Sequence, residues 1–473
     1  MTNPTTSPLK PIATNSKLNG HSRVLEHDGN TVNISNAGQI PIGTFVRFGN
    51  FIGVVTKHSR SLTQVTLYFE KEGARWGLPL RAVPSQLEVQ QLTDEEWLEV
   101  QKSIYPKRIV IGNIRQAGIS ASAYFPPLAE LRTLIIGTSG AGKTTTMMAI
   151  LVGYRNAMFE YSKRLDSKTQ KPVVPGLLAF DLKQDLTGNL RDADSVYRPN
   201  LQRCLKEEIY VYRFGELFCN LRDVPVDVVI QCLGKLSPAQ NRWVVCYLND
   251  QTGHDAIEGL MKDDQEWPSL FPEMTVQGKM PAANRDSLVA LRSIFKSFFN
   301  EPLFSEKKQS NWKEAIDLLY QGKVVVVDLV DYGEIQRNFL AVLLMRFILH
   351  KQKLSVKLDQ TCYPIVVAGP ELHRLSQAQE TIELFARMCR AYHIGFIFDS
   401  QDLADFPEIV GSVINRGIVL RTEGVSCERL LRRFPELKPY NREVFRLETG
   451  TGFLVGGNLA IPVSFIEPKL DRK

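Results

Sequence analysis

The 473-residue sequence predicts an α/β fold in which helices cover a parallel-rich sheet and a small β-barrel comes first. Between residues 40 and 114, short segments alternate apolar and polar residues, which is the pattern of half-buried strands. Beyond residue 128, continuous apolar runs of strand length recur, as expected for strands that are buried on both faces. These runs are 134–136, 176–180, 324–327, 365–368, 395–398, 417–420 and 452–455.

Changes in composition divide the chain into regions. Residues 1–38 hold few large apolar side chains and are predicted to form a disordered tail, and residues 466–473 a C-terminal tail. Residues 39–115 are predicted to form the small barrel, and Thr93 with Glu96 forms a capping box that predicts a short helix there. Residues 116–465 form the core, with a helical insertion around 190–310.

The overall composition is that of a globular protein. Hydrophobic residues make up 44% and charged residues 23%, which excludes wholly disordered and collagen-like chains. Seven scattered cysteines without a C-x-x-C pair argue against a disulfide framework or a zinc site. The sequence has no apolar run of about 18 residues and no secretory signal pattern, so we expect a cytoplasmic protein without a membrane span.

The strongest chemical signal is GTSGAGKT at residues 137–144, which matches G-x-x-x-x-G-K-[ST]. It follows the apolar run 134–136 and opens a stretch of helical character, so backbone N–H groups and a helix N-terminus would face phosphate oxygens. Lys143 would reach the β- and γ-phosphates, and Thr144 would bind Mg²⁺. ATP and Mg²⁺ are therefore the expected cofactors. The expected nucleotide contacts are Gly137, Thr138, Ser139, Gly140, Ala141, Gly142, Lys143, Thr144 and Thr145.

The residues alone do not identify which carboxylate works together with the phosphate-binding loop. Asp181, Asp328 and Asp399 each end an apolar run, as expected for a carboxylate at the end of a buried strand. Asp328 follows four valines and is the best formal match. It is followed by Leu329, however, and not by the glutamate that an adjacent general base requires.

Several segments read in order resemble the HerA/FtsK superfamily of ring-forming DNA-pumping ATPases, and most closely its HerA-like branch. Residues 180–186, FDLKQDL, resemble the strand that ends in D-P-K-G-E-[LY]. Residues 365–375, IVVAGPELHRL, resemble h-h-h-h-D-E-A-H-R-L. Residues 389–401, CRAYHIGFIFDSQ, are similar to G-R-K-[FY]-G-x-G-h-h-h-x-T-Q, and residues 41–55 resemble the HAS-type barrel that precedes such motors. The resemblance covers about residues 40–465 and implies a RecA-like P-loop ATPase core.

The resemblance also implies residue roles. Glu371 would be the general base that activates water, and Gln401 the sensor of the γ-phosphate. Arg390 would be the arginine finger that reaches a neighbouring subunit's nucleotide, with Arg421 as the second choice. Asp181 would join Thr144 at the metal, although a structural capping role for this carboxylate stays open.

One departure from the family pattern bears on hydrolysis. The position of the Walker B aspartate is occupied by Pro370, which has neither charge nor a backbone donor. Magnesium binding would then be weak or supported by another carboxylate such as Asp181. Alternatively, the nucleotide would act as a structural or switching ligand.

Three function classes follow. The resemblance implies a hexameric DNA translocase of helicase type with double-stranded DNA in its pore and a separate nuclease or effector as partner, in DNA repair or antiviral defence. The net charge of +6 is compatible with this polyanion, and the basic cluster Arg429, Arg432 and Arg433 is a candidate phosphate contact. The alternatives are a nucleotide-dependent assembly scaffold with little turnover and a coupling ATPase of a secretion or conjugation apparatus.

Overall fold

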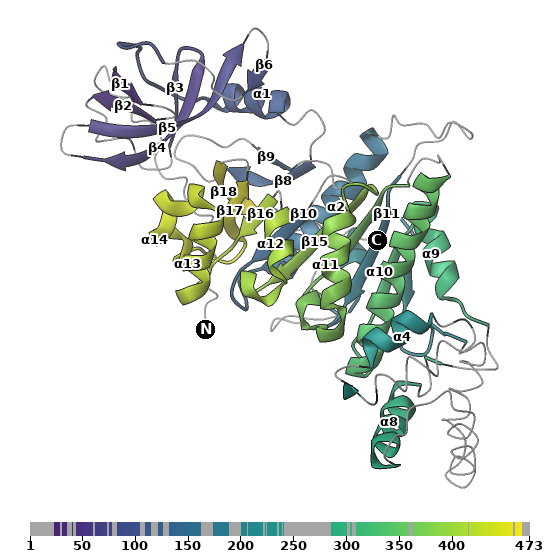
Figure 1. Cartoon of the computed structure of the whole chain (residues 1–473). Coiled ribbons are helices and arrows are strands. Elements are labelled where there is room, and N and C mark those ends of the chain that lie inside the picture. Colours follow the sequence, from purple (N-terminus) through teal and green to yellow (C-terminus); the bar gives the residue numbers. More distant parts are fainter. Residues whose placement is uncertain are drawn as a thin grey trace, which may run out of the picture. The chain divides into compact units, whose positions relative to one another are not determined.

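Figure 1 shows the structure, which is a computed structural model. The chain divides into two compact units. The first unit comprises residues 1–161, 399–403 and 414–469, and the second unit residues 162–398, 404–413 and 470–473. The structure describes residues 23–28, 31–35, 40, 44–59, 62–72, 75–77, 83–104, 109–114, 122–125, 132–161, 174–188, 200–205, 207–220, 223, 225–233, 236–238, 240, 285–299, 303–304, 309–358, 363–414, 416–456 and 459–465.

An antiparallel sheet in the first unit corresponds to the predicted barrel. Its strands are β1 (Val24–Asp28), β2 (Thr31–Ser35), β3 (Phe45–Phe48), β4 (Phe51–His58), β5 (Leu62–Glu72), β6 (Arg75–Gly77) and β7 (Gln90–Gln91). They pair in the order β1-β2-β5-β4-β3-β7, and β6 pairs with β5. Arg23 bridges Glu88, and the N–H of Val24 donates to the Leu87 carbonyl at 3.1 Å. The segment before β7 therefore returns to β1, which curls the sheet towards a barrel.

Strands β1 and β2 lie in the stretch that we predicted to be a disordered tail. The prediction is wrong for these residues, because Val32 and Ile34 alternate with half-buried neighbours and are themselves fully buried in the sheet's core. A few apolar side chains at period two suffice when a larger sheet supplies the surface that they cover. Apart from Arg23, the other residues of 1–38 lie outside the described residues, as does the predicted C-terminal tail 466–473.

Helix α1 (Asp94–Ile104) confirms the capping box. The Thr93 N–H donates to Glu96 Oε2 at 2.9 Å, and the Glu96 N–H donates to Thr93 Oγ1 at 3.2 Å. The helix buries Trp97, whose ring centroid lies 4.4 Å from that of Phe45 in β3. The capped helix thus contributes a large aromatic side chain to the core of the small sheet.

A second set of strands in the first unit carries the phosphate-binding motif. They are β8 (Ile109–Ile114), β9 (Ser122–Phe125), β10 (Arg132–Ile136), β16 (Arg416–Val419), β17 (Thr451–Gly456) and β18 (Leu459–Phe465). Strands β10 and β16 are parallel, and the others continue antiparallel in the order β16-β17-β18-β8-β9. The helical segments here are α2 (Lys143–Tyr161), α13 (Gly424–Arg433), η6 (Pro435–Tyr440) and α14 (Asn441–Val444).

Strand β8 was predicted to belong to the barrel but pairs elsewhere. Ile114 lies opposite Val463 of β18, which places β8 in the sheet of the P-loop strand β10. The burial pattern of a strand records which faces are covered but not which strand will be its neighbour. The boundary that we expected at residue 115 is therefore wrong for β8.

The second unit contains the predicted parallel sheet. Its strands are β11 (Gly176–Asp181), β12 (Ile209–Tyr212), β13 (Val324–Asp328), β14 (Ile365–Gly369) and β15 (Ile394–Ser400), whose last two residues belong to the first unit. The order is β12-β13-β11-β14-β15, and each pair is parallel. Every residue of β11, β13, β14 and β15 is buried, which confirms the interpretation of the continuous apolar runs.

Helices accompany these strands along the sequence (Figure 1). They are α3 (Leu201–Cys204), α4 (Val226–Cys232), α8 (Arg285–Phe298), α9 (Trp312–Tyr320), α10 (Glu334–Lys357), α11 (Gln379–Met388) and α12 (Glu408–Val413), with the short turns η3 (Leu372–Arg374), η4 (Ser376–Ala378) and η5 (Leu403–Asp405). The expected helical insertion around 190–310 is only partly helical in the described residues, because β12 extends the sheet beside β13. Much of this region, including residues 241–284, lies outside them.

Candidate nucleotide-binding and catalytic site

The predicted phosphate-binding loop has the expected strand–loop–helix setting. Strand β10 ends at Ile136, α2 begins at Lys143, and residues 137–142 connect them. Gly140 and Gly142 have φ angles of 75° and 95°, a region that L side chains rarely adopt. A Cβ on Gly142 would also lie 3.2 Å from the backbone nitrogen of Gly450. The two glycines are therefore required by the path of the loop.

Neighbouring segments of the first unit hold the loop in place. The Thr138 N–H and hydroxyl both donate to the Arg421 carbonyl, at 2.8 and 3.2 Å. The Gly137 N–H donates to the Ser400 carbonyl at 3.2 Å, and the Thr449 hydroxyl donates to the Gly140 carbonyl at 3.2 Å. The loop is thus fixed by the ends of β15 and β16 and by the segment before β17.

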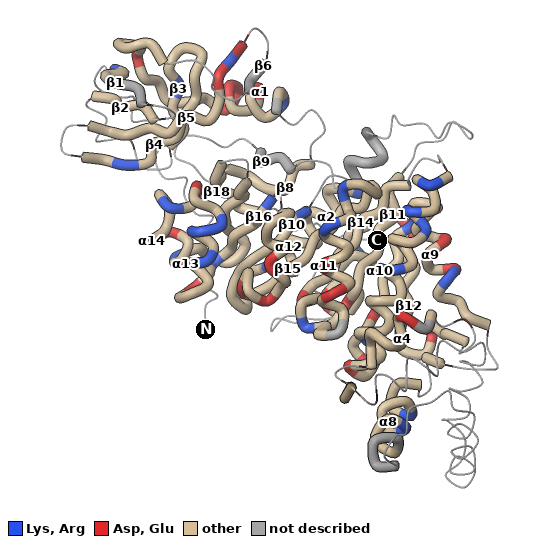
Figure 2. The backbone as a smooth tube through the Cα atoms, in the orientation of Figure 1, with Lys and Arg blue, Asp and Glu red and all other residues tan. Residues whose placement is uncertain are grey.

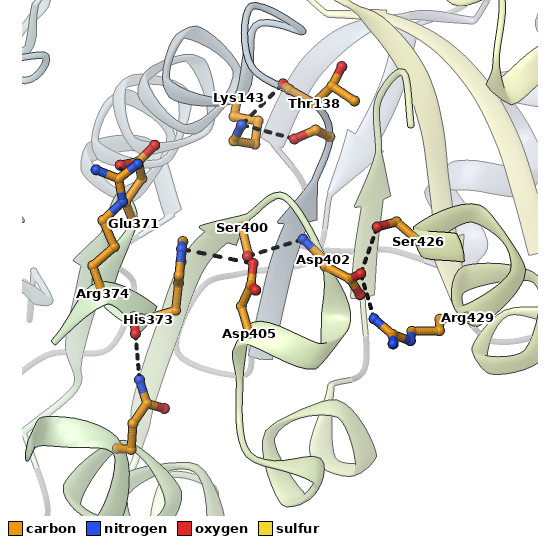
Figure 3. A network of polar contacts seen from close by, with 12 residues as sticks. Thr138, Lys143, Glu371, His373, Arg374, Ser400, Asp402, Asp405, Ser426 and Arg429 are labelled. Atoms are coloured by element: carbon orange, nitrogen blue, oxygen red, sulfur yellow. Dashed lines mark hydrogen bonds and ion pairs between the residues drawn. The ribbon is translucent and has the colours of Figure 1, made fainter. Parts of the chain in front are cut away.

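The Lys143 side chain reaches back into the phosphate-binding loop, which directly precedes Lys143 in the sequence. Its ammonium donates to the carbonyls of Gly137 at 2.9 Å and Thr138 at 3.2 Å, and the residue is 8% exposed (Figure 3). Thr144 and Thr145, the next residues of α2, are half-buried. A buried cation and the first turn of a helix together form an anion-binding site.

Gln401 lies next to the strand end that contacts the phosphate-binding loop. Gln401 is exposed and follows Ser400, whose carbonyl accepts from the loop. The next residue, Asp402, accepts from the Ser426 hydroxyl at 2.7 Å and from Arg429 at 2.6 Å, as Figure 3 shows. The turn that carries Gln401 is therefore tied to α13.

Helix α13 carries the basic cluster that we considered for DNA contact (Figure 2). Arg429 is engaged by Asp402 and is half-buried, whereas Arg432 is exposed. The Arg433 guanidinium donates to the Ile414 carbonyl at 3.3 Å. Internal contacts thus account for two of these arginines and leave Arg432 as the exposed member of the cluster.

Asp181 ends β11 and organises the turn that follows it. Its Oδ1 accepts from the N–H groups of Lys183 at 3.3 Å and Asp185 at 3.1 Å. Its Oδ2 accepts from the N–H groups of Leu186 at 2.9 Å and Thr187 at 3.0 Å, and from the Thr187 hydroxyl at 3.0 Å. Burial raises the pKa of Asp181, and these hydrogen bonds oppose that rise. The arrangement favours the structural capping role over the predicted contact with magnesium.

Asp328 ends β13 directly beside Asp181 in the parallel register. Its Oδ1 accepts from the Val330 N–H at 3.1 Å, and its Oδ2 accepts from the Gln184 side chain at 3.3 Å. Burial raises the pKa of Asp328, and the neighbouring Asp181 carboxylate raises it further. Two acidic side chains therefore meet at adjacent strand ends, with Asp328 the less heavily bonded of the two.

Glu371 follows β14 and is held in an unusual conformation. Its φ angle is 55°, in the left-handed region that costs about 1–2 kcal/mol for a residue with a side chain. The side chain is 9% exposed and accepts from Lys183 Nζ at 2.6 Å through Oε1. Oε2 pairs with Arg374 Nε at 2.9 Å, and Figure 3 shows Arg374 alongside Glu371. The structure thus buries a carboxylate between two cations at a strained position.

Sequence reasoning gave no role to Lys183, although it lies in the segment that resembles D-P-K-G-E. Three glycine positions of the family motifs are also occupied by larger residues, Gln184, Cys389 and His393. Gln184 and His393 have φ angles of 59° and 53°, in the left-handed region that glycine adopts without strain. The signal in the sequence was the resemblance to the family motifs, whose glycine positions indicate turns with positive φ.

The two candidate arginine fingers differ in their surroundings. Arg390 follows α11, is exposed, and makes no ion pair or side-chain hydrogen bond with any residue that the structure describes. Arg421 is half-buried, and its carbonyl fixes Thr138 of the loop. Arg390 is therefore the arginine available to a partner molecule, and Arg421 is part of the loop's support.

The predicted site residues fall into two groups. The loop, Lys143, Gln401 and Arg421 belong to the first unit, whereas Asp181, Asp328, Glu371 and Arg390 belong to the second unit. The described residues include no group of three or more His, Cys, Asp or Glu side chains arranged to hold a metal ion. Among the described helices, none has the length and apolar character needed to cross a membrane.

Comparison with known proteins finds similar solved structures. No protein-family model matches the chain, and no curated protein matches it in sequence. The unbound bacterial conjugative coupling protein TrwBdeltaN70 matches with a TM-score of 0.51 and 8% identity, over 80% of this chain and 93% of that one. Its trigonal form in complex with sulphate gives 0.50 and 11%, over 78% and 95%.

The chain has a P-loop ATPase fold. This result confirms the predicted α/β class with its RecA-like core, whereas the HerA-like branch stays a prediction. VirB4 of Thermoanaerobacter pseudethanolicus also matches, with a TM-score of 0.48 and 13% identity, over 76% of this chain and 96% of that one.

We predict that Asp181→Asn destabilises the fold more than Asp328→Asn. An amide at position 181 places an NH₂ group against backbone N–H donors, which leaves buried groups unsatisfied at about 1–3 kcal/mol each. Asp328 accepts fewer such bonds, so its amide should lower the free energy of unfolding by about 1 kcal/mol or less. Urea unfolding of the two variants measures the difference, and equal losses would show that Asp181 is not the organiser of this turn.

Proposed function

We propose that the chain is a Mg²⁺-dependent ATP-hydrolysing motor. The observation that carries this proposal is the anchored loop 137–142 with Lys143 buried inside it. The residues fit a triphosphate: glycines leave room at the loop, backbone N–H groups and the α2 N-terminus favour anions, and the Lys143 ammonium exchanges carbonyl acceptors for phosphate oxygens. The Thr144 hydroxyl would bind the magnesium ion, which neutralises charge that develops on the phosphates.

In this proposal the second unit supplies Glu371 and Arg390 for hydrolysis, and the first unit supplies Gln401. Glu371 accepts a proton from the attacking water, since it is a carboxylate held at a strand end. Arg390 reaches the nucleotide of a neighbouring subunit, which its exposed side chain supports. Gln401 senses the γ-phosphate from the end of β15, which the loop contacts through Ser400.

Pro370 supports a second candidate function, in which bound ATP holds an assembly together and ATP hydrolysis is slow. Proline offers no magnesium ligand at that position, and Asp181 is engaged by its own turn. Mg²⁺ would then depend on Thr144 and the phosphates, with Asp328 as the less heavily bonded carboxylate. A scaffold of this kind would bind ATP without hydrolysing it.

The likeness to the conjugative coupling protein TrwB favours a motor of the coupling type. The order of the sequence motifs and the barrel-like sheet favour a HerA-like translocase that works with a nuclease or effector. Both proposals share a hexameric ring around DNA with ATP bound between subunits. We place the coupling type first because the overall architecture supports it.

Phosphate release in the presence of Mg²⁺ tests the proposed hydrolysis. The wild-type chain should turn over ATP, and Lys143→Ala and Glu371→Gln should each lower the rate by about 100-fold or more, since one removes phosphate binding and the other the base. Lys313→Ala is a matched control, because Lys313 forms a surface ion pair with Asp223 in the second unit. Equal rates in all four proteins would reject hydrolysis, and ATP binding without turnover would support the scaffold.

A comparison of two arginines at one end of α11 tests the shared site. Arg390→Ala should assemble with an ATP analogue but lose about 10³-fold in turnover, as expected for an arginine finger. Arg387→Ala is the control, because Arg387 pairs with Glu383 on the same helix. Sedimentation gives the assembly and phosphate release gives the rate. A monomeric chain, or the same rate in both variants, would contradict the proposed ring.

Both motor types act on DNA in this proposal, so duplex DNA should stimulate ATP turnover. The stimulation should fall steeply between about 50 and 200 mM salt, since phosphate contacts release counterions. Turnover that no polymer stimulates, or a response independent of salt, would reject both.

A further inference from the structure

We propose that Lys183 is a positioning residue for Glu371. The Lys183 ammonium orients the Glu371 carboxylate so that the carboxylate takes a proton from the attacking water. This inference rests on the proposed hydrolysis and names a residue to which no role has been given. Three observations carry it: the contact between the two side chains, the turn that presents Lys183, and the strain at Glu371.

The contact is short and uses one carboxylate oxygen. Lys183 Nζ lies 2.6 Å from Glu371 Oε1, while Arg374 Nε lies 2.9 Å from Oε2. An ionised carboxylate has about four acceptor directions, and these two cations use one on each oxygen. In the proposed reaction the attacking water donates to Glu371 while Lys183 remains in place.

The backbone of the turn after β11 fixes the position of Lys183. Its N–H donates to Asp181 Oδ1 at 3.3 Å, and the next residue, Gln184, adopts the left-handed φ of 59°. Strands β11 and β14 are parallel neighbours, with Ala179 opposite Ala368 near their carboxyl ends. Lys183 and Glu371 therefore come from adjacent strand ends, and the turn organised by Asp181 brings the ammonium to the carboxylate.

Burial and strain at Glu371 distinguish this pair from a surface ion pair. The Glu371 side chain is 9% exposed, and its φ is 55°. The pair of Lys313 with Asp223 is longer, at 3.4 Å, and its side chains are 51% and 36% exposed. Exposed pairs of that kind contribute about 0–1 kcal/mol, whereas a buried carboxylate that loses its cation is strongly destabilised. The fold thus holds a buried, strained carboxylate against the Lys183 ammonium, whose own side chain is 44% exposed.

Arg374 does not provide the same function. It lies three residues after Glu371 in the same turn, where its N–H donates to the Glu371 carbonyl at 3.0 Å. Arg374 therefore moves with Glu371, whereas Lys183 belongs to another strand end and fixes Glu371 relative to β11. A base oriented by a third group is a general arrangement in activated sites.

Steady-state ATP hydrolysis by the full chain tests the inference. Lys183→Ala should lower kcat by about tenfold or more and change KM for ATP by less than about threefold, because the base is misplaced but the phosphate loop is intact. Lys183→Arg should retain kcat within about threefold, since a cation again meets Oε1. Lys313→Ala should behave as the wild type. In the Glu371→Gln background, Lys183→Ala should cause no further loss, because the two residues act as one unit.

The outcomes separate this inference from the proposed function. If Glu371→Gln hydrolyses ATP as the wild type does, the proposed function fails. If Glu371→Gln is inactive while Lys183→Ala keeps wild-type kcat, only the inference is overturned. If Lys183→Ala raises KM and lowers the unfolding temperature together, and Lys183→Arg restores neither, Lys183 is merely structural and the inference is also overturned.

Discussion

A carboxylate removed from water must be given hydrogen-bond donors or cations, and this constraint shapes the strand ends of the second unit. Asp181 is satisfied by the backbone of the turn that follows β11. That turn presents Lys183, which in turn satisfies Glu371 at the end of β14. Asp328 shares the same edge through its register with Asp181. The position of the proposed base is thus a consequence of how its acidic neighbours are accommodated.

Local patterns could be predicted from the sequence because neighbouring residues determine them. The phosphate-binding loop depends on glycines at positive φ, the α1 capping box on residues three apart, and the buried strands on continuous apolar runs. Gln184 and His393 stand at glycine positions of the motifs that the chain resembles, and both adopt the left-handed conformation that glycine takes without strain.

Pairings between distant residues could not be predicted. Lys183 and Glu371 are 188 positions apart, and a single sequence does not state that their strands are neighbours. The same limit explains β8, which joins β18 rather than the barrel-like sheet, and β12, which joins β13 although it lies in an expected helical insertion. Asp181 was predicted to bind magnesium, but its carboxylate accepts hydrogen bonds from the turn that follows it. A side-chain carboxylate bonds readily to nearby backbone donors.

The central claim is that Glu371, oriented by Lys183, activates water beside a triphosphate held by Lys143. A structure of the chain with ADP, Mg²⁺ and a fluoride mimic of the γ-phosphate tests it most directly. The account predicts the mimic on Lys143 and an ordered water within about 3.2 Å of a Glu371 carboxylate oxygen, with Lys183 still on that carboxylate. A nucleotide bound away from residues 137–144, or an attacking water held by another carboxylate such as Asp328, would contradict it.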